Sequence, residues 1–191
     1  MQIRAKIIER LQKIKAPIKL EFPVNCKNAS VLLILSMDYD KILFTQRSMK
    51  LSKHGGEISF PGGLWEPNET ALEAALRETE EEIGLKSVNI DVLGSLFPVP
   101  NRFGAIKVHP FVGVSKIPFP SSFHLSEEVD RVFVLSISEL CDESRIKRES
   151  FRNSSILIPS FEIDENARLW GLTSFITYFF IENIIKPLQI V

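Results

Sequence analysis

The stretch that decides the fold is "GLWEPNETALEAALRETEEEIGL", residues 63–85, in which a turn-rich start leads into one amphipathic pattern. Its last part, "RETEEEIGL" at residues 77–85, places four glutamates in five positions. At about 100° per residue, one stripe of this segment is suited to face a core, namely Leu72, Leu76, Thr79 and Ile83. The pattern predicts a helix that begins after residue 68 and buries one face.

The glutamates of this helix are sorted onto one side. Glu78, Glu81 and Glu82 share a sector that Ala71 and Ala74 leave sterically open. Carboxylates near a helix C-terminus oppose each other and the helix dipole, each by a few tenths of a kcal/mol. A bound divalent cation would reverse that interaction, and ligands that are all oxygen suit Mg²⁺ or Mn²⁺ together with substrate phosphates. The alternative is a solvated acidic face, the usual role of a run of charges.

The whole chain has the composition of a globular protein. Its 191 residues, 45% hydrophobic and 25% charged, suit a single domain over residues 1–191. The net charge of -1 gives no reason to expect nucleic acid as a partner. The two cysteines match neither a zinc spacing nor a disulfide framework, which indicates a reducing compartment. Without a signal peptide or a spanning segment, we expect a cytoplasmic protein with no membrane partner.

Strands outnumber helices along the chain. "VLLILS" and "KILFTQ" flank "MDYD" at residues 37–40 and predict a β-hairpin. Further strands are predicted at residues 88–99, 106–114, 129–137 and 154–163, and further helices at residues 3–14 and 172–185. This order favours a mixed α/β (α+β) domain with a largely antiparallel or mixed sheet, rather than regular alternation of strand and helix.

A glycine- and proline-rich loop, "HGGEISFPGG" at residues 54–63, leads toward the central helix. Such a loop is rigid and allows close approach to its backbone. From its last glycine onward the spacing resembles the Nudix box, the signature of hydrolases that cleave a nucleoside diphosphate linked to another moiety. The positions that carry this resemblance are Gly63, Glu69, Arg77, Glu78, Glu81, Glu82, Gly84 and Leu85. Thr79 departs from the pattern, which has an aliphatic residue there.

A second resemblance narrows the family. "LFTQRSMKLSKHGGEISFPGG", residues 43–63, is similar to the motif that precedes the box in the coenzyme A pyrophosphatase subgroup, and "LWGLTSFI", residues 169–176, resembles the start of that subgroup's C-terminal helix. The resemblance implies the Nudix fold, an α/β/α sandwich around a mixed sheet. It also implies hydrolysis of the diphosphate of coenzyme A to 3′,5′-ADP and 4′-phosphopantetheine, with Mg²⁺ or Mn²⁺ as cofactor. The sequence leaves the oligomeric state open, with a homodimer as one possibility because members of the family are often dimers.

The resemblance implies roles for four carboxylates. Glu78 and Glu82 would be the main metal ligands, and Glu81 would be a further ligand or the group that activates water. Glu57 would be an additional ligand or would position water, with a loop-bracing role as its alternative. Which carboxylate acts as the general base stays open.

Substrate contacts are implied just before the box. Arg47, at the end of a predicted strand, would hold a phosphate bidentately. Lys53 and His54 add positive charge nearby, which suits a substrate with an extra 3′-phosphate. For Lys53 a solvated loop position is the alternative, and for His54 the alternative is an ordering role in the loop.

Three other glutamates have secondary roles in this interpretation. Glu69 would support the geometry of loop and helix together with Arg77, although a surface pair of Arg77 with Glu73 is also compatible with the helical spacing. Glu127 and Glu128, which follow the loop "PFPSSFHLS" at residues 118–126, are candidates to complete the metal site, with a turn before a strand as the alternative.

Two other functions are compatible with the sequence. A sibling enzyme would act on ADP-ribose, a dinucleotide or a nucleoside triphosphate, because pocket residues outside these motifs decide specificity. A binding module would keep the fold as a ligand sensor. Sensors of that kind often lose box glutamates, and this chain retains them all.

Overall fold

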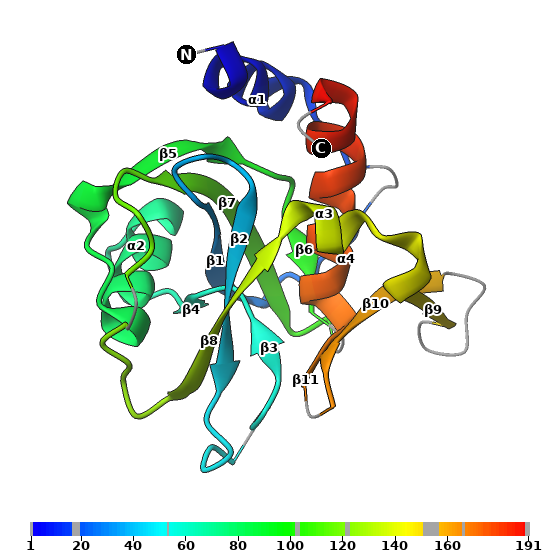
Figure 1. The fold of residues 1–191 in the computed structure, drawn as a ribbon. Coiled ribbons are helices and arrows are strands. Elements are labelled where there is room, and N and C mark those ends of the chain that lie inside the picture. The colour runs from blue at the N-terminus through cyan, green and yellow to red at the C-terminus, as the bar shows by residue number, and fades with distance from the viewer. Residues whose placement is uncertain are drawn as a thin grey trace.

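A mixed β-sheet lies between helices in the computed structural model of this chain (Figure 1). The structure describes residues 2–16, 20–52, 54–101, 104–120, 123–150, 157–165 and 167–189. Lys53, one of the predicted substrate contacts, lies outside the described residues.

The main sheet has the strand order β3-β2-β1-β7-β5, with β4 paired to β1, β6 to β7 and β8 to β2. β1 and β7 run parallel, and the other pairs are antiparallel. The predicted hairpin is confirmed, since Ile34 of β1 lies opposite Leu43 of β2. The strands of this sheet are β1 (Lys27–Leu35), β2 (Lys41–Arg47), β3 (Ile58–Ser59), β4 (Gly62–Leu64), β5 (Ile90–Ser95), β6 (Val99–Pro100), β7 (Ile106–Ser115) and β8 (Val129–Ser136).

Alternation along β1 supplies both faces of the sheet with core residues. Leu33 and Leu35 belong to one apolar cluster, and Leu32 and Ile34 belong to another on the opposite face. All four side chains are fully buried. A strand buried on both faces reads as a continuous apolar run, as "VLLIL" does.

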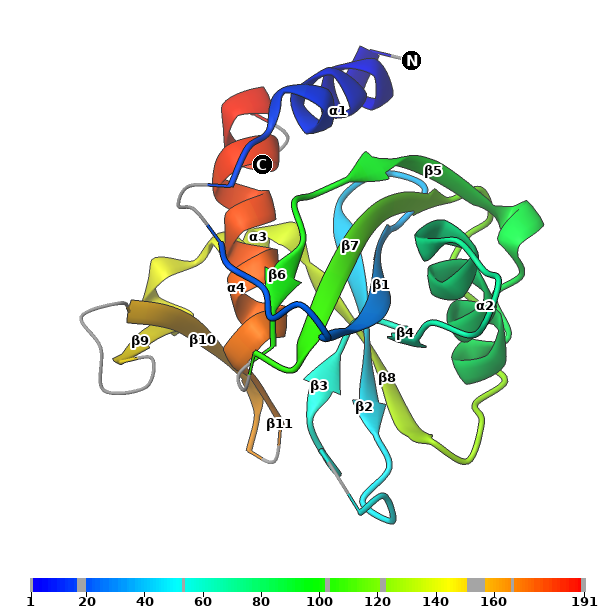
Figure 2. The same ribbon diagram turned by 180° about the vertical axis from the view of Figure 1, so that it is seen from behind.

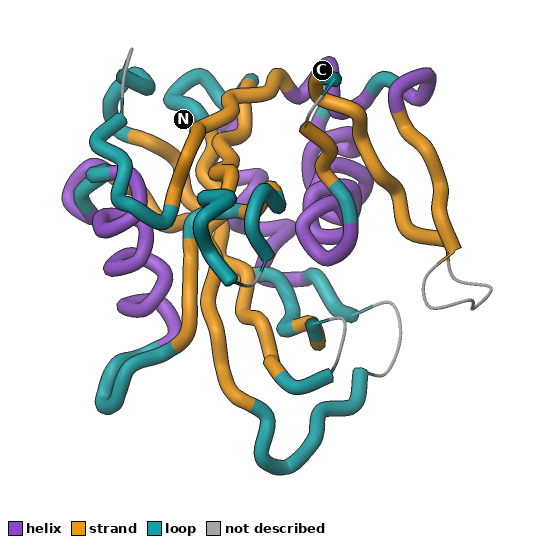
Figure 3. The backbone as a smooth tube through the Cα atoms, turned by 90° about the horizontal axis from the view of Figure 1, so that it is seen from below, coloured by secondary structure: helices purple, strands orange, loops and turns teal. Residues whose placement is uncertain are grey.

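Helices cover both faces, so the fold is an α/β/α sandwich, as expected. α2 packs on one side of the sheet and α4 on the other (Figure 3), while α1 lies beside β5 and the end of α4 (Figure 2). The helices are α1 (Gln2–Lys13), α2 (Ala71–Ile83), α3 (Ile137–Cys141) and α4 (Gly171–Phe180), which continues as a π-helical turn at Ile181–Ile185. Short 3₁₀ turns lie at Ser87–Asn89, Glu143–Arg145 and Lys186–Leu188.

A second, three-stranded antiparallel sheet packs against α4 through its middle strand. Its strands are β9 (Ile146–Ser150), β10 (Leu157–Asp164) and β11 (Ala167–Leu169). β10 confirms the strand predicted at residues 154–163 from its fourth residue onward, and residues 154–156 lie outside the described part of the chain. The short elements β3, β4, β9, β11 and α3 were not predicted, because two to five residues give no periodic pattern.

The central helix begins and ends as its sequence requires. Thr70 caps its N-terminus in a capping box with Glu73, and Gly84 ends it in the left-handed conformation with φ 72°. Its buried face differs from the predicted stripe, since Leu72 and Leu76 are only partly buried. Fully buried are Ala74, Ala75, Thr79, Glu82 and Ile83.

No helix in the described residues is both long enough and apolar enough to cross a membrane.

Candidate active site

Two adjacent glycines of β4 bring this strand close to its neighbours. Gly62 has φ 152°, and a Cβ there would lie 2.2 Å from the carbonyl oxygen of Ser30 in β1. A Cβ at Gly63 would lie 2.3 Å from Oε1 of Glu78. Only glycine leaves room for both contacts, so β4 pairs with β1 on one side and receives a carboxylate of α2 on the other.

Glu82 is a buried carboxylate beside this strand, with 4% of its surface exposed. The Gly62 amide donates to its Oε2 at 3.3 Å, and Nη1 of Arg47 lies 3.7 Å from its Oε1. Burial raises the pKa of Glu82 to about 8, against the smaller opposing effects of these two groups. The expectation of a sterically open sector is therefore wrong for Glu82, because the glycine strand approaches α2 closely enough to cover it.

Arg77 organises the other carboxylates of α2. Its Nη1 lies 3.0 Å from both Glu78 and Glu81, and its Nε and Nη2 donate to the two oxygens of Glu69 at 3.0 Å. Nη2 also donates to the Leu64 carbonyl at 3.2 Å. Arg77 thus ties β4, the loop and the helix together, the supporting role expected for it and Glu69.

The alternative pairing of Arg77 with Glu73 is wrong. Glu73 accepts a hydrogen bond from the Thr70 amide at 2.7 Å, which closes the capping box at the start of the helix. Capping satisfies a backbone amide that has no partner within the helix, and this contact takes the Glu73 side chain away from Arg77.

Glu78 and Glu81 differ in exposure although they share one guanidinium. The Glu78 side chain is 20% exposed and the Glu81 side chain is 58% exposed. Burial raises the pKa of Glu78, and the hydrogen bond from Arg77 opposes this effect. Glu81 is therefore the carboxylate of the pair that solvent reaches most easily.

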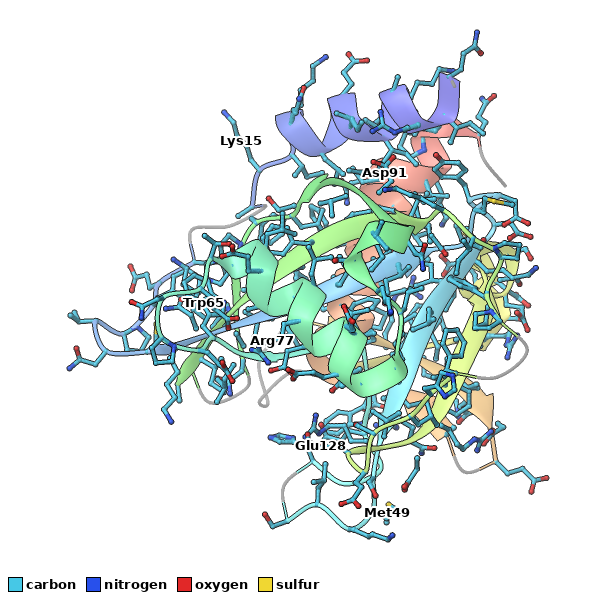
Figure 4. All side chains as sticks on the ribbon, turned by 90° about the vertical axis from the view of Figure 1, so that its left-hand side faces the viewer. Lys15, Met49, Trp65, Arg77, Asp91 and Glu128 are labelled. Atoms are coloured by element: carbon cyan, nitrogen blue, oxygen red, sulfur yellow. The ribbon has the colours of Figure 1, made fainter. Side chains whose placement is uncertain are left out.

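Arg47, at the end of β2, joins Glu82 to the segment before β8. Its Nη2 lies 3.2 Å from Oε2 of Glu128, while its Nη1 faces Glu82. Backbone hydrogen bonds fix both neighbours of this arrangement, from the Ser48 amide to the Glu128 carbonyl at 2.7 Å and from the Ser126 amide to the Glu82 carbonyl at 3.0 Å. Figure 4 shows Glu128 below α2, on the same side of the molecule as Arg77.

His54 and Glu57 form a pair within the loop that follows β2. Nδ1 of His54 lies 3.0 Å from Oε2 of Glu57, and both side chains are exposed by more than a third. The Arg47 amide donates to the Glu57 carbonyl at 2.9 Å. This hydrogen bond brings the loop back to the end of β2, so that His54 and Glu57 lie near Arg47. Among the described interactions, neither side chain contacts Glu82.

Asp130 is a residue that the sequence did not single out. The Met49 amide donates to its Oδ2 at 2.9 Å, and this bond lowers the pKa of Asp130. A cavity of about 650 Å³ lies between the loop and the start of β8. Its lining includes three acidic residues and one lysine, namely Glu127, Glu128, Asp130 and Lys50.

The carboxylates fit a divalent cation by their chemistry and burial. Within the described chain, no three acidic, histidine or cysteine side chains form a ready-made metal-binding group. Instead, guanidinium groups lie between the carboxylates, Arg47 between Glu82 and Glu128 and Arg77 between Glu78 and Glu81. Glu82 accepts one backbone hydrogen bond, and the Arg47 guanidinium lies beyond hydrogen-bonding distance from it, so this buried carboxylate is incompletely compensated. Carboxylate oxygens are ligands that suit Mg²⁺ and Mn²⁺.

Curated relatives share most of the length of this chain. Nudix hydrolase 3 of Caenorhabditis elegans is 35% identical over 150 residues, which cover 70% of this chain and 62% of that protein. A Nudix hydrolase named NudL from Yersinia enterocolitica is 34% identical over 178 residues, which cover 89% of this chain and 87% of that protein. The mouse mitochondrial coenzyme A diphosphatase NUDT8 is 36% identical over 152 residues, covering 77% of this chain and 72% of that protein.

Solved structures support the fold. A MutT/nudix family protein from Enterococcus faecalis superposes with a TM-score of 0.53 at 20% identity, covering 97% of this chain and 73% of that chain. Residues 26–155, more than half of the chain, match the NUDIX domain. Together with the relatives above 30% identity, this match shows that the chain belongs to the Nudix hydrolase family.

Proposed function

We propose that this protein hydrolyses the diphosphate linkage of coenzyme A or a close derivative, with Mg²⁺ or Mn²⁺ as cofactor. The observation that carries the proposal is the carboxylate of Glu82, which is buried against Gly62 and faces the guanidinium of Arg47. Anion-binding and cation-binding groups thus adjoin each other, as hydrolysis of a metal-bound diphosphate requires.

Glu78 and Glu82 would hold the metal, with Glu128 or Glu81 as a further ligand. The bound cation would neutralise the diphosphate and lower the pKa of the attacking water. Gly62 and Gly63 keep the two ligands in place, because their backbone leaves room for the Glu78 carboxylate and donates to Glu82.

The remaining residues act on substrate and water. Arg47 would bind a phosphate oxygen, since its planar guanidinium suits bidentate contact with phosphate. Glu81, the most exposed carboxylate of α2 in this site, is suited to accept a proton from water, with Glu78 and Glu57 as the other candidates for that step. His54 would reach the substrate only after its pairing with Glu57 is exchanged, and Lys53 stays a prediction.

Coenzyme A is favoured over other diphosphates by two similarities. The mouse relative is named a coenzyme A diphosphatase, and residues 43–63 resemble the motif of that subgroup. ADP-ribose, a dinucleotide or a nucleoside triphosphate would be cleaved by the same carboxylates, and they are the competing substrates in the test below.

The test is a product analysis with matched variants. The purified protein is incubated with Mg²⁺ or Mn²⁺ and coenzyme A, ADP-ribose, NADH or ATP, and the products are identified by mass. We expect release of 3′,5′-ADP and 4′-phosphopantetheine from coenzyme A at the highest kcat/KM, and no release with chelator. Preference for a different substrate would contradict the assignment of coenzyme A. Failure to hydrolyse any of the four compounds would contradict the proposed hydrolase activity.

Glu82→Gln and Glu80→Gln make a matched pair for this assay. Both changes replace a carboxyl group of α2 with an amide, but Glu80 is exposed and lies outside the site, whereas Glu82 is buried beside Gly62. We expect Glu82→Gln to reduce kcat by more than about 100-fold. A loss of up to about 100-fold is typical of residues that only orient a metal ligand, so a larger loss indicates that Glu82 is itself a ligand. Glu80→Gln should keep wild-type turnover.

We also propose that residues 1–191 act as one domain. One apolar cluster contains side chains from Ile7 in α1 to Ile185 after α4, and it includes Ile146 of the second sheet. A shared core of this kind favours cooperative unfolding. The homodimer, the absence of nucleic-acid partners and the cytoplasmic location stay predictions from the sequence.

A further inference from the structure

The two arginines of the site are held very differently. Arg77 donates to Glu69 through two nitrogens and to the Leu64 carbonyl, besides its contacts with Glu78 and Glu81. These contacts fix its guanidinium from several sides, and some of them come from the loop and the backbone rather than from the metal-binding candidates.

Arg47 is held only by carboxylates of the site among the described side-chain interactions. It lies 3.2 Å from Glu128 and 3.7 Å from Glu82, and only the first distance is within the range of a hydrogen bond. Its side chain is 26% exposed and ends β2, next to the loop that begins at Ser48. The guanidinium is therefore able to turn on its flexible stem without breaking contacts to the backbone.

The position of Arg47 is that of a counter-ion. Glu82 is almost fully buried, and a buried carboxylate requires a compensating charge or a proton. A divalent cation bound to Glu82 would supply more positive charge at the same oxygens and would repel the guanidinium. A diphosphate beside that cation would in turn offer the guanidinium new anionic oxygens in bidentate geometry.

We propose that Arg47 is an exchangeable counter-ion, which pairs with Glu128 and faces Glu82 in the metal-free protein and moves to the substrate diphosphate when a divalent cation binds. The inference rests on the proposed function and adds a coupling to it. The cation displaces Arg47 from Glu82, and the diphosphate receives Arg47, so each ligand favours the binding of the other. By linkage, the coupling is the same in both directions.

Binding of Mn²⁺ alone tests the first half of this exchange. Free Mn²⁺ is measured by electron paramagnetic resonance at pH 8.5 with wild type, Arg47→Met and Glu82→Gln, without substrate. We expect Arg47→Met to bind Mn²⁺ about 3- to 30-fold more tightly, because the competing cation is gone. Equal or weaker binding in Arg47→Met would overturn the proposal. The Mn²⁺ affinities of Arg47→Gln and Arg47→Lys are measured in the same way. Arg47→Lys keeps the positive charge and should bind Mn²⁺ with intermediate affinity.

Arg131→Met is the matched control. Arg131 lies on β8 opposite Gln46, the neighbour of Arg47 in β2, where a bulge interrupts the register of the two strands. Its guanidinium lies over the ring of Phe133, which belongs to the apolar cluster on the α4 face of the sheet, away from α2. It also pairs with a carboxylate, Asp164, at 3.2 Å. The control removes the same charge from a neighbouring strand, and its Mn²⁺ affinity should equal that of wild type within about twofold.

The second half is tested with the non-hydrolysable adenosine 5′-(α,β-methylene)diphosphate. Its dissociation constant is measured by calorimetry with and without Mn²⁺, after correction for Mn²⁺ chelated in solution. We expect Mn²⁺ to tighten nucleotide binding at least about fivefold more in wild type and Arg131→Met than in Arg47→Met. Undiminished coupling in Arg47→Met would show that Arg47 does not exchange partners.

The Glu82→Gln measurement separates the two proposals. If Glu82→Gln keeps wild-type Mn²⁺ affinity, the metal site itself is wrongly assigned and the proposed function fails. If Glu82→Gln loses Mn²⁺ while Arg47→Met matches wild type, the metal site stands and only the exchange of Arg47 is refuted.

Discussion

The carboxylate of Glu78 occupies the space that any side chain at position 63 would fill, since a Cβ on Gly63 would lie 2.3 Å from its Oε1. The neighbouring Gly62 is restricted by backbone instead, because its Cβ would lie 2.2 Å from the Ser30 carbonyl oxygen. The Glu78 carboxylate can move more easily than the backbone of a paired strand. A side chain at position 63 is therefore expected to disturb the site, and a side chain at position 62 is expected to destabilise the fold.

Gly63→Ala is expected to impair catalysis more than folding. The new methyl group displaces the Glu78 carboxylate from its position on β4, and we expect kcat to fall by about 100-fold or more, as when ligand geometry is lost. Thermal unfolding should shift by only a few degrees. Gly62→Ala, in contrast, should lose at least about 3 kcal/mol of stability through a clash with backbone at φ 152°. Equal stability losses in the two variants would contradict this division.

The stability of the metal-free protein should fall as pH rises through neutrality. Burial raises the pKa of Glu82 to about 8, so the folded state holds its proton up to that pH, whereas the unfolded chain releases it near about 4.3. Between those values the folded state binds more protons, and the free energy of unfolding decreases by an amount on the order of a few kcal/mol.

Glu82→Gln should remove this pH dependence. Denaturant unfolding of chelator-treated protein at pH 5 and pH 8 measures it, and we expect the variant to equal or exceed wild type at pH 8. An unchanged difference between the two pH values in the variant would show that Glu82 does not carry the effect. Glu80→Gln, exposed on the same helix, serves as the control.

Arg77→Lys is expected to behave as a damaging substitution although the charge is kept. One ammonium group cannot replace the planar fork that joins Glu69, Glu78 and the Leu64 carbonyl. We expect a loss of about 1–3 kcal/mol in unfolding free energy and a lower kcat from misplaced carboxylates. A variant with wild-type stability and kcat would show that the fork geometry is unimportant.

Asp91→Asn tests a contact far from the site. Nε and Nη2 of Arg4 in α1 donate to Asp91 in β5, and this hydrogen bond lowers the pKa of Asp91. The pair therefore stabilises the fold above the unfolded pKa of about 3.9, and its effect is lost as pH falls through the lower folded value. We expect a small loss of thermal stability at pH 7, none once Asp91 is protonated in the folded protein, and unchanged kcat. A reduced kcat in a fully folded Asp91→Asn variant would show that the contact between α1 and β5 affects the site.

The periodic elements of the fold could be predicted from the sequence, but the burial of Glu82 in the site could not. The hairpin of β1 and β2, the strand β7 and the helix α2 each carry a repeating apolar pattern over several residues. The burial of Glu82 depends instead on β4, which has three residues and pairs with β1 across more than 30 positions of sequence. Helical spacing alone placed Glu82 beside Glu81 and gave no sign that one is covered and the other exposed.

Contacts between distant segments were equally hidden. Arg47 and Glu128 are 81 positions apart, and Asp130 meets the Met49 amide over the same separation. The sequence indicated that Glu128 follows a loop, which made it a candidate, but nothing in the pattern around Asp130 distinguishes it from an ordinary strand-start residue. Such pairings follow from the register of β2 with β8, which only the folded sheet defines.

The parallel pairing of β1 with β7 has a consequence for how the chain is made. One edge of β1 stays open until Ile106–Ser115 has been synthesised, because its partner there lies more than 70 residues downstream. A buried apolar strand with a free edge invites pairing with other chains. Nascent chains that stall before residue 106 are therefore expected to aggregate or to recruit chaperones, whereas chains released beyond β8 have every strand of the main sheet available.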